Sequence, residues 1–294
     1  MHKLSPLASK TLTFPITPDF SVEAVWSESI LPLLKGINDN VIELLHYGFA
    51  QLAGNVVAHS ASPDVVVEIL YTTAKIRISI NDSGVGVLSK LAGRLGMCDA
   101  RHAAVELVRG KVQKNPQDGV AVTARMFDEF TLRSGNLMLS RVGANDWLLA
   151  SHEASSPGTF IVMANHPRSP RTVQEVFEQG AQLPTIRANL LVKQAAAGDH
   201  AEAPQYEHSR AGGKLSKSTG ETLESADEAK QLLEPYTGFN EIFLDFAGVK
   251  EIAAEFADEA FKGFRARNPG IKLMWGNANV EVEETIQGVA ESAA

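Results

Sequence analysis

Two short stretches stand out in the first half of the chain: Tyr47-Gly48-Phe49-Ala50-Gln51-Leu52-Ala53-Gly54-Asn55-Val56-Val57-Ala58-His59-Ser60, and Asp82-Ser83-Gly84-Val85-Gly86. From about Asp39 through the first stretch, apolar residues recur at helical spacing. The pattern predicts a helix that ends before Ser62-Pro63, because proline disfavours helical geometry in the preceding residue. Strands are predicted over Val65–Leu70 and Lys75–Ile80, so the second stretch directly follows a hairpin.

The polar residues of these stretches suit a bound nucleotide. Gln51, Asn55 and His59 are spaced by four residues, so their side chains lie along one face of the helix. An asparagine amide oxygen can ligate Mg²⁺ beside phosphates, an aspartate can accept a hydrogen bond from an adenine amino group, and glycines let the backbone approach a ligand closely. We therefore expect the following residues to face one nucleotide-binding cavity: Asn55, His59, Asp82, Gly84 and Gly86. Each also has a structural explanation, as a helix-face amide, a capping histidine or an ordinary glycine turn, so the prediction depends on their occurring together.

The remaining pattern predicts an α+β protein of two domains. A short helix is expected over 19–34 and another over 99–111, and four further strands of one antiparallel sheet are expected at 130–133, 137–141, 147–150 and 159–164. Residues 1–180 would form the first domain, closed by a short helix at 172–179. Residues 181–294 would form a small α/β domain of alternating strands and helices, with a flexible loop at 195–213.

Composition narrows the function classes. The chain has 294 residues with 44% hydrophobic and 21% charged residues, which is typical of a globular protein with a packed core. Its formal net charge of -8 argues against broad electrostatic binding to nucleic acid or anionic membrane. Cys98 is the single cysteine, and no stretch has the length of a signal peptide core or a membrane span. A cytoplasmic location is expected.

The first stretch resembles the N-box helix of the GHKL, or Bergerat-fold, ATPases, whose usual form is Glu, then Asn four residues later, then often His. Asp82–Gly86 resembles their G1 box, and Gly158-Thr159 resembles a late Gly-Thr pair near the adenine. The motifs occur in the family order across about residues 19–180. The resemblance implies a Bergerat-type α/β sandwich that binds ATP and Mg²⁺, with Asn55 as metal ligand and Thr159 and Gly119 as further nucleotide contacts.

Two positions depart from that family pattern. Gln51 stands where the family has a glutamate thought to act as general base, and an amide cannot accept a proton at neutral pH. Loss of this base would cost the hydrolytic step about 10²- to 10⁴-fold. In the ATP lid, relatives tend to have Gly-Glu-Gly where this chain has Gln117-Asp118-Gly119, which restricts the backbone that must fold over the phosphates.

The C-terminal part, from about Leu215 to Gly288, resembles a STAS-like domain of unknown function, notably at Leu244–Val249 and Asn277-Ala278-Asn279. In STAS partners of anti-sigma kinases, the turn after such a strand carries a serine that accepts phosphate. The corresponding stretch here, 251–255, has no hydroxyl group, so phosphoryl transfer to this turn is not expected. Ser216 and Ser218 are candidates for another contact, although ordinary loop serines are the favoured explanation.

Three functions remain open at this point. The leading hypothesis is an ATP-binding regulatory protein with impaired catalysis, whose nucleotide state controls contacts with a protein partner. The second is an active ATPase or serine protein kinase in which another carboxylate, such as Glu43, replaces the missing base. The third is an interaction protein that has lost nucleotide binding. A homodimer is expected by analogy with similar ATPases alone.

Overall fold

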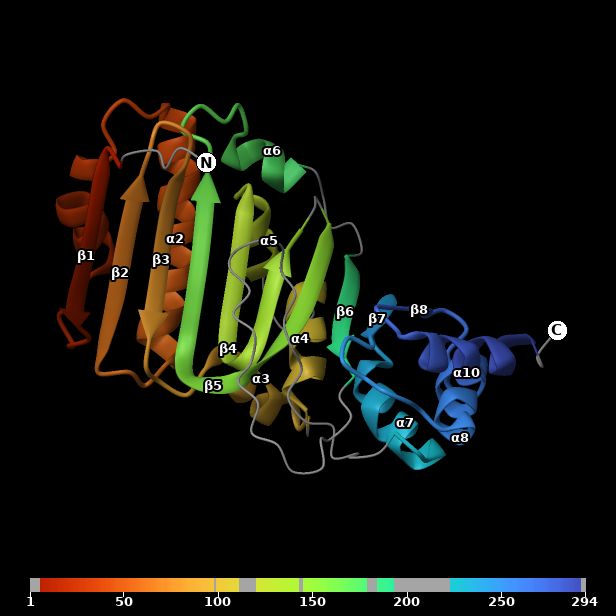
Figure 1. Ribbon diagram of the computed structural model, residues 1–294. Coiled ribbons are helices and arrows are strands. Elements are labelled where there is room, and N and C mark those ends of the chain that lie inside the picture. The colour runs from red at the N-terminus through yellow and green to blue at the C-terminus, as the bar shows by residue number, and fades with distance from the viewer. Residues whose placement is uncertain are drawn as a thin grey trace. The chain divides into compact units, whose positions relative to one another are not determined.

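The chain divides into two compact units. The computed structural model describes residues 6–97, 99–110, 120–142, 145–178, 184–192 and 223–291 (Figure 1). Unit 1 comprises Met1–Trp147 and Ser155–Pro184, and unit 2 comprises Leu148–Ala154 and Thr185–Ala294. Within the described ranges, no helix has both the length and the apolar composition needed to cross a membrane.

A mainly antiparallel sheet forms the body of unit 1. The strand order is β1-β2-β3-β5, and β4 pairs with β5. The antiparallel register places Val65 opposite Asp82 and Ile80 opposite Ile161. The strands are β1 (Ala8–Pro15), β2 (Asp64–Tyr71), β3 (Ile76–Asp82), β4 (Glu129–Arg141) and β5 (Asp146–Asn165).

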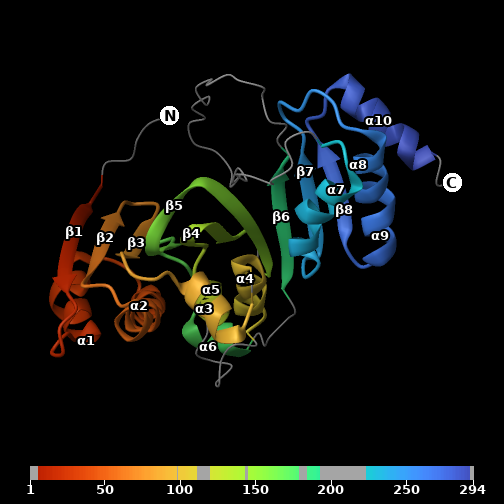
Figure 2. The ribbon, with the colours of Figure 1, turned by 90° about the horizontal axis from the view of Figure 1, so that it is seen from below.

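Helices cover one face of this sheet (Figure 2). Side chains of β2 and β3 that alternate toward the helices are at most 1% exposed: Val65, Val67, Ile69, Ile76, Ile78 and Ile80. This alternation is what a sheet with one covered face requires. The longer helices are α2 (Asp39–His59), α3 (Val87–Leu95) and α4 (Ala100–Arg109), and the shorter ones are α1 (Val22–Ala24), α5 (Val120–Arg125) and α6 (Val173–Glu178).

Helix α2 is the central element of unit 1. Its buried stripe contains large apolar residues, all at most 5% exposed: Val41, Leu44, Leu45, Phe49, Leu52 and Val56. Gly48 lies in this stripe, and a Cβ there would be 2.2 Å from the ring of Phe127. Close packing therefore fixes the rotation of α2, which determines the residues it turns toward β3 and α3.

Several expected elements differ from those observed. The single helix expected over 19–34 is divided into α1, a π-helical turn η1 (Val25–Ile30) and a 3₁₀ turn η2 (Leu31–Leu33), and Pro32 lacks the N–H donor that a continuing α-helix would use. The four short strands expected between 130 and 164 are two long strands, β4 and β5. Gly135 and Gly158 lie inside these strands with φ of 63° and 73°, so they locally change the strand geometry without ending the strands.

Unit 2 contains a parallel sheet with helices packed against it. Strand β6 (Thr185–Leu191) pairs with β7 (Glu241–Asp245), which pairs with β8 (Lys272–Gly276), all in parallel. The helical elements are α7 (Ala226–Leu233), η3 (Glu234–Tyr236), α8 (Ala254–Asp258), η4 (Glu259–Gly263), α9 (Phe264–Arg267) and α10 (Val280–Glu291). The helical segment over 254–267 thus contains the π-helical turn η4 between α8 and α9. The whole molecule is α+β with parallel and antiparallel strand pairs.

Candidate functional site

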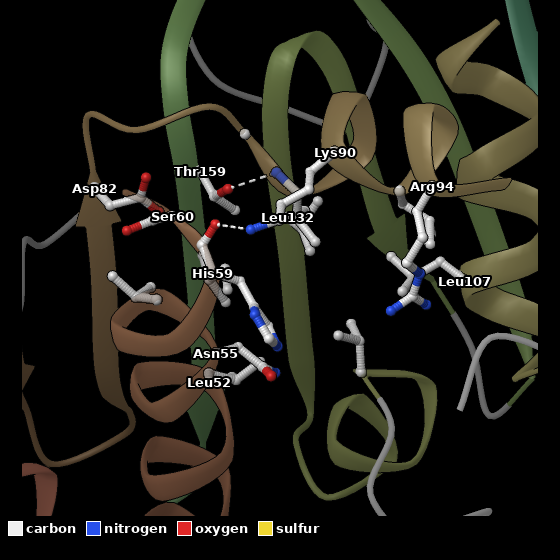
Figure 3. Close-up of a pocket in the computed structure, with 16 residues that line it drawn as sticks. Leu52, Asn55, His59, Ser60, Asp82, Lys90, Arg94, Leu107, Leu132 and Thr159 are labelled. Atoms are coloured by element: carbon white, nitrogen blue, oxygen red, sulfur yellow. Dashed lines mark hydrogen bonds between the residues drawn. The ribbon is translucent and has the colours of Figure 1, made fainter. Parts of the chain in front are cut away.

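A cavity lies in unit 1, beside the C-terminal half of α2. Its volume is about 760 Å³, within the roughly 300–1,000 Å³ typical of small-molecule sites. The end of β3, the first turns of α3 and parts of β4 and β5 complete its wall (Figure 3). The lining includes the following predicted site residues: Asn55, His59, Asp82, Gly86 and Thr159.

Helix α2 contributes one face to this cavity. Leu52, Asn55, Val56 and His59 line it, at the i, i+3, i+4 and i+7 positions expected of one helical face. Asn55 and His59 are exposed within the cavity, whereas Leu52 and Val56 are buried. Gln51, which we expected to point into the same site, is half-buried and is not among the described residues that line the cavity.

Asp82 is the buried carboxylate of the site and is 2% exposed. Its Oδ1 accepts a hydrogen bond of 2.9 Å from the backbone N–H of Gly84. Its Oδ2 is buried and has no hydrogen-bond partner among the described residues. Burial raises the pKa of Asp82 above its usual 3.8, and hydrogen bonds from the amide of Gly84 and from Thr159 oppose the increase. Asp82 Oδ2 is therefore a buried acceptor for which no described residue supplies a donor.

Gly84 was expected to contact the ligand, but the structure gives it a supporting position outside the cavity lining. The loop around it is bound to the segment that follows α2. The N–H of Val85 donates to the carbonyl of Ser60 at 2.9 Å, and the N–H of Ser83 donates to Oγ of Ser62 at 3.1 Å. A Cβ at Gly84 would be 1.9 Å from the Ser60 carbonyl oxygen, so only glycine permits this approach. The two motifs recognised in the sequence are thus physically joined.

Thr159 links β5 to the start of α3. Its Oγ1 accepts a hydrogen bond of 3.0 Å from the N–H of Val87 (Figure 3), and Oγ of Ser134 accepts one of 3.1 Å from the N–H of Leu88. These bonds satisfy backbone donors of the first turn of α3, which have no partner within the helix. Side chains from β4 and β5 therefore fix α3 against the cavity.

Two cationic residues of the cavity were not predicted from the sequence. Lys90 and Arg94 lie one turn apart on α3 and both line the cavity. The Nζ of Lys90 donates to the carbonyl of His59 at 2.7 Å (Figure 3), at the C-terminal end of α2 where carbonyl dipoles favour a cation. Leu88 and Leu91, buried and three residues apart, give a helical signal after Gly86 that could have revealed this helix.

The site offers few metal ligands. Asn55 is the predicted Mg²⁺ ligand, and no group of three or more His, Cys, Asp or Glu residues in the described ranges is arranged to hold a metal ion. Gly119, with the expected lid of Gln117 and Asp118, lies outside the described residues. The described arrangement can accept a hydrogen bond from a planar donor at Asp82 and can attract an anion at Lys90 and Arg94.

Comparison with known proteins identifies a domain in unit 2. A family model described as a STAS-like domain of unknown function (DUF4325) matches residues 229–283, from α7 into α10. This match agrees with the resemblance seen in the sequence of that part. No curated protein matches the chain.

Proposed function

We propose that the chain is an ATP-binding regulatory protein in which unit 1 is a GHKL-type, Bergerat-fold module and unit 2 is a STAS-like companion domain. The observation that carries the proposal is Asp82, whose buried Oδ2 has no hydrogen-bond partner among the described residues and which is one of the residues that line a cavity of about 760 Å³. A buried carboxylate oxygen without a donor costs free energy, so its retention points to a ligand that supplies the donor.

An adenine base fits this environment. Its exocyclic amino group can donate to Asp82 Oδ2, and the apolar cavity residues Val56, Leu132 and Ile161 suit the faces of an aromatic ring. Gly86 has a φ of 78°, and a Cβ there would be 3.0 Å from the carbonyl oxygen of Gly158. The glycine thus keeps two backbone segments in close contact beside the base.

An ATP site must also bind Mg²⁺ and the phosphates, and the exposed face of α2 is the part of the cavity that would bind them. Asn55 would supply an amide oxygen to the metal, and phosphate oxygens and water would complete its coordination, as is usual for Mg²⁺. A bound Mg²⁺ would neutralise phosphate charge. His59 lies one turn further along α2 and could donate to a phosphate oxygen.

Gln51 makes binding with little hydrolysis the expected behaviour. Its amide can orient a water molecule but cannot remove a proton from it. Glu43, the alternative base, lies two turns before Gln51 on α2 and is therefore farther along the helix from Asn55 and His59, which line the cavity. We therefore favour a role in which bound nucleotide changes contacts with a protein partner, with or without a homodimer.

Calorimetric titration of the full chain with Mg-ATP tests the proposal. Wild type should bind, and Asp82→Asn should weaken binding about 10- to 100-fold, the value of a hydrogen bond to a charged group. The asparagine must turn its oxygen toward the N–H of Gly84, which leaves its NH₂ facing the amino group of the base. Asp39→Asn, at an exposed position at the start of α2, is the matched control and should bind like wild type. Absence of binding by wild type would favour a nucleotide-free interaction protein.

A further inference from the structure

The ionisable residues of the cavity are unequally distributed between the two signs. Among the described lining residues, Asp82 is the single carboxylate, whereas Lys90 and Arg94 are both cationic. The chain as a whole has a formal net charge of -8, so a cavity with more cations than carboxylates runs against the overall composition. Local positive charge in an acidic protein indicates an anionic ligand group.

The two cations are placed in sequence along one wall. On helix α3, Lys90 and Arg94 line the cavity together with the buried Leu91. Figure 3 shows Asp82 and Thr159 at one side of the cavity, Lys90 between, and Arg94 at the far side near Leu107. A ligand that begins at Asp82 therefore reaches Lys90 before it reaches Arg94.

A hydrogen bond positions the ammonium group of Lys90 within the cavity. Its contact with the carbonyl of His59 uses one of the three N–H donors of the ammonium group. That contact crosses from α3 to the end of α2, so the charge lies next to the face that carries Asn55 and His59. Arg94 contributes a planar guanidinium, which matches phosphate oxygens with two parallel donors.

Most of the remaining cavity wall is apolar, including Leu91, Leu107, Val120 and Leu132. Lys90 and Arg94 are exposed residues beside this wall, so each added phosphate charge of a ligand should gain from its attraction to both cations.

We propose that Lys90 and Arg94 form a phosphate-recognition wall, so that the affinity of this site for an adenine nucleotide increases with the number of its phosphates. The proposal rests on the nucleotide site described above and names its ligand class, a nucleoside di- or triphosphate in preference to a monophosphate. Arg94 reads the distal phosphate and Lys90 the proximal one.

The test is calorimetric titration of the full chain with ATP, ADP and AMP, for wild type, Arg94→Gln and Lys90→Gln. Wild type should bind ATP and ADP more tightly than AMP. Arg94→Gln should lose about 10- to 100-fold in ATP affinity but no more than about twofold in AMP affinity. Arg168→Gln, which removes an equivalent charge at an exposed position of unit 1 outside the cavity lining, is the control and should match wild type.

Two results would overturn the proposal, and they differ in what they imply for the proposed adenine site at Asp82, called the base site below. If Arg94→Gln and Lys90→Gln bind ATP like wild type while Asp82→Asn does not, the phosphate wall is wrong and the base site stands. If wild type binds none of the three nucleotides, the base site itself is wrong. Circular dichroism of each variant checks that the substitutions leave the fold intact.

Discussion

Replacing Gly158 by alanine should displace the backbone of Asp82 and so disturb the site. Gly158 has a φ of 73°, and a Cβ there would be 1.8 Å from the Asp82 carbonyl oxygen and 2.8 Å from its Oδ1. The new methyl group would therefore push against the strand end that holds the proposed adenine acceptor.

The expected cost has two parts. A non-glycine residue in the left-handed region costs about 1–2 kcal/mol. The overlap with backbone adds an overpacking cost of about 1–3 kcal/mol, because the neighbouring atom belongs to main chain and cannot rotate away. Gly158→Ala should thus lower the free energy of unfolding of unit 1 by about 2–5 kcal/mol.

Gly135→Ala provides a matched control on the neighbouring strand. Its φ is 63°, close to that of Gly158, but the added Cβ would meet only Oγ of Ser155, at 3.6 Å. This variant should show the conformational cost alone, about 1–2 kcal/mol. The difference between the two variants isolates the close approach to Asp82.

Urea unfolding followed by tryptophan fluorescence measures the effect, because Trp26 and Trp147 are both 3% exposed in unit 1. A Gly158→Ala variant no less stable than Gly135→Ala would refute the argument that β5 and the end of β3 are in obligatory contact here. Nucleotide titration of the same two variants should show the larger loss of affinity in Gly158→Ala.

Three further predictions concern charge, catalysis and unit 2. Asp82→Asn should raise the free energy of unfolding at pH 7, because burial raises the pKa of Asp82 and so disfavours its ionised form in the folded state. In urea titrations at several pH values, the difference in free energy of unfolding between Asp82→Asn and wild type should shrink as the pH falls through the pKa of Asp82 in the folded state toward 3.8. A difference that does not change with pH would contradict this prediction. Gln51→Glu should raise phosphate release from Mg-ATP about 10²- to 10⁴-fold in a single-turnover assay, and equal rates would show that Gln51 does not limit turnover. Ser225→Ala should destabilise unit 2 by about 1 kcal/mol, since Ser225 Oγ accepts a hydrogen bond from the N–H of Glu228 in a capping box. Urea unfolding followed by Trp275 fluorescence measures this change, and an unchanged free energy of unfolding would contradict the prediction.

Elements with strong periodicity were predictable from sequence. Helix α2 runs from Asp39 to His59, close to the expected bounds, because its apolar residues follow a helical period over many turns. In β3, Ile76, Ile78 and Ile80 alternate with polar residues, and β2 is a short run rich in valine, so both carry a strand signal.

Other elements could not be recognised from local pattern. Strand β1 is an edge strand in which no residue is fully buried, so its sequence has only the short alternation Thr11-Leu12-Thr13-Phe14. Strands β4 and β5 were each predicted as two shorter strands, and Gly135 and Gly158 lie in the gaps between those predicted strands although both belong to continuous strands.

The site was predictable where its residues lie on one helix or one turn. Asn55 and His59, four residues apart on α2, line the same cavity as Asp82, whereas Gln51, at the same spacing, does not line it. Lys90 and Arg94 were missed because their role depends on the position of α3, which is fixed by hydrogen bonds to Thr159 and Ser134 from distant strands. Such tertiary contacts leave no periodic signal in the sequence.

A crystal structure of the full chain grown with Mg²⁺ and a non-hydrolysable ATP analogue tests the nucleotide site most directly. The account predicts the exocyclic amino group of the base within hydrogen-bond distance of Asp82 Oδ2, the metal on the amide oxygen of Asn55, and phosphate oxygens facing α3. An analogue bound elsewhere, or a base whose amino group faces away from Asp82, would contradict it.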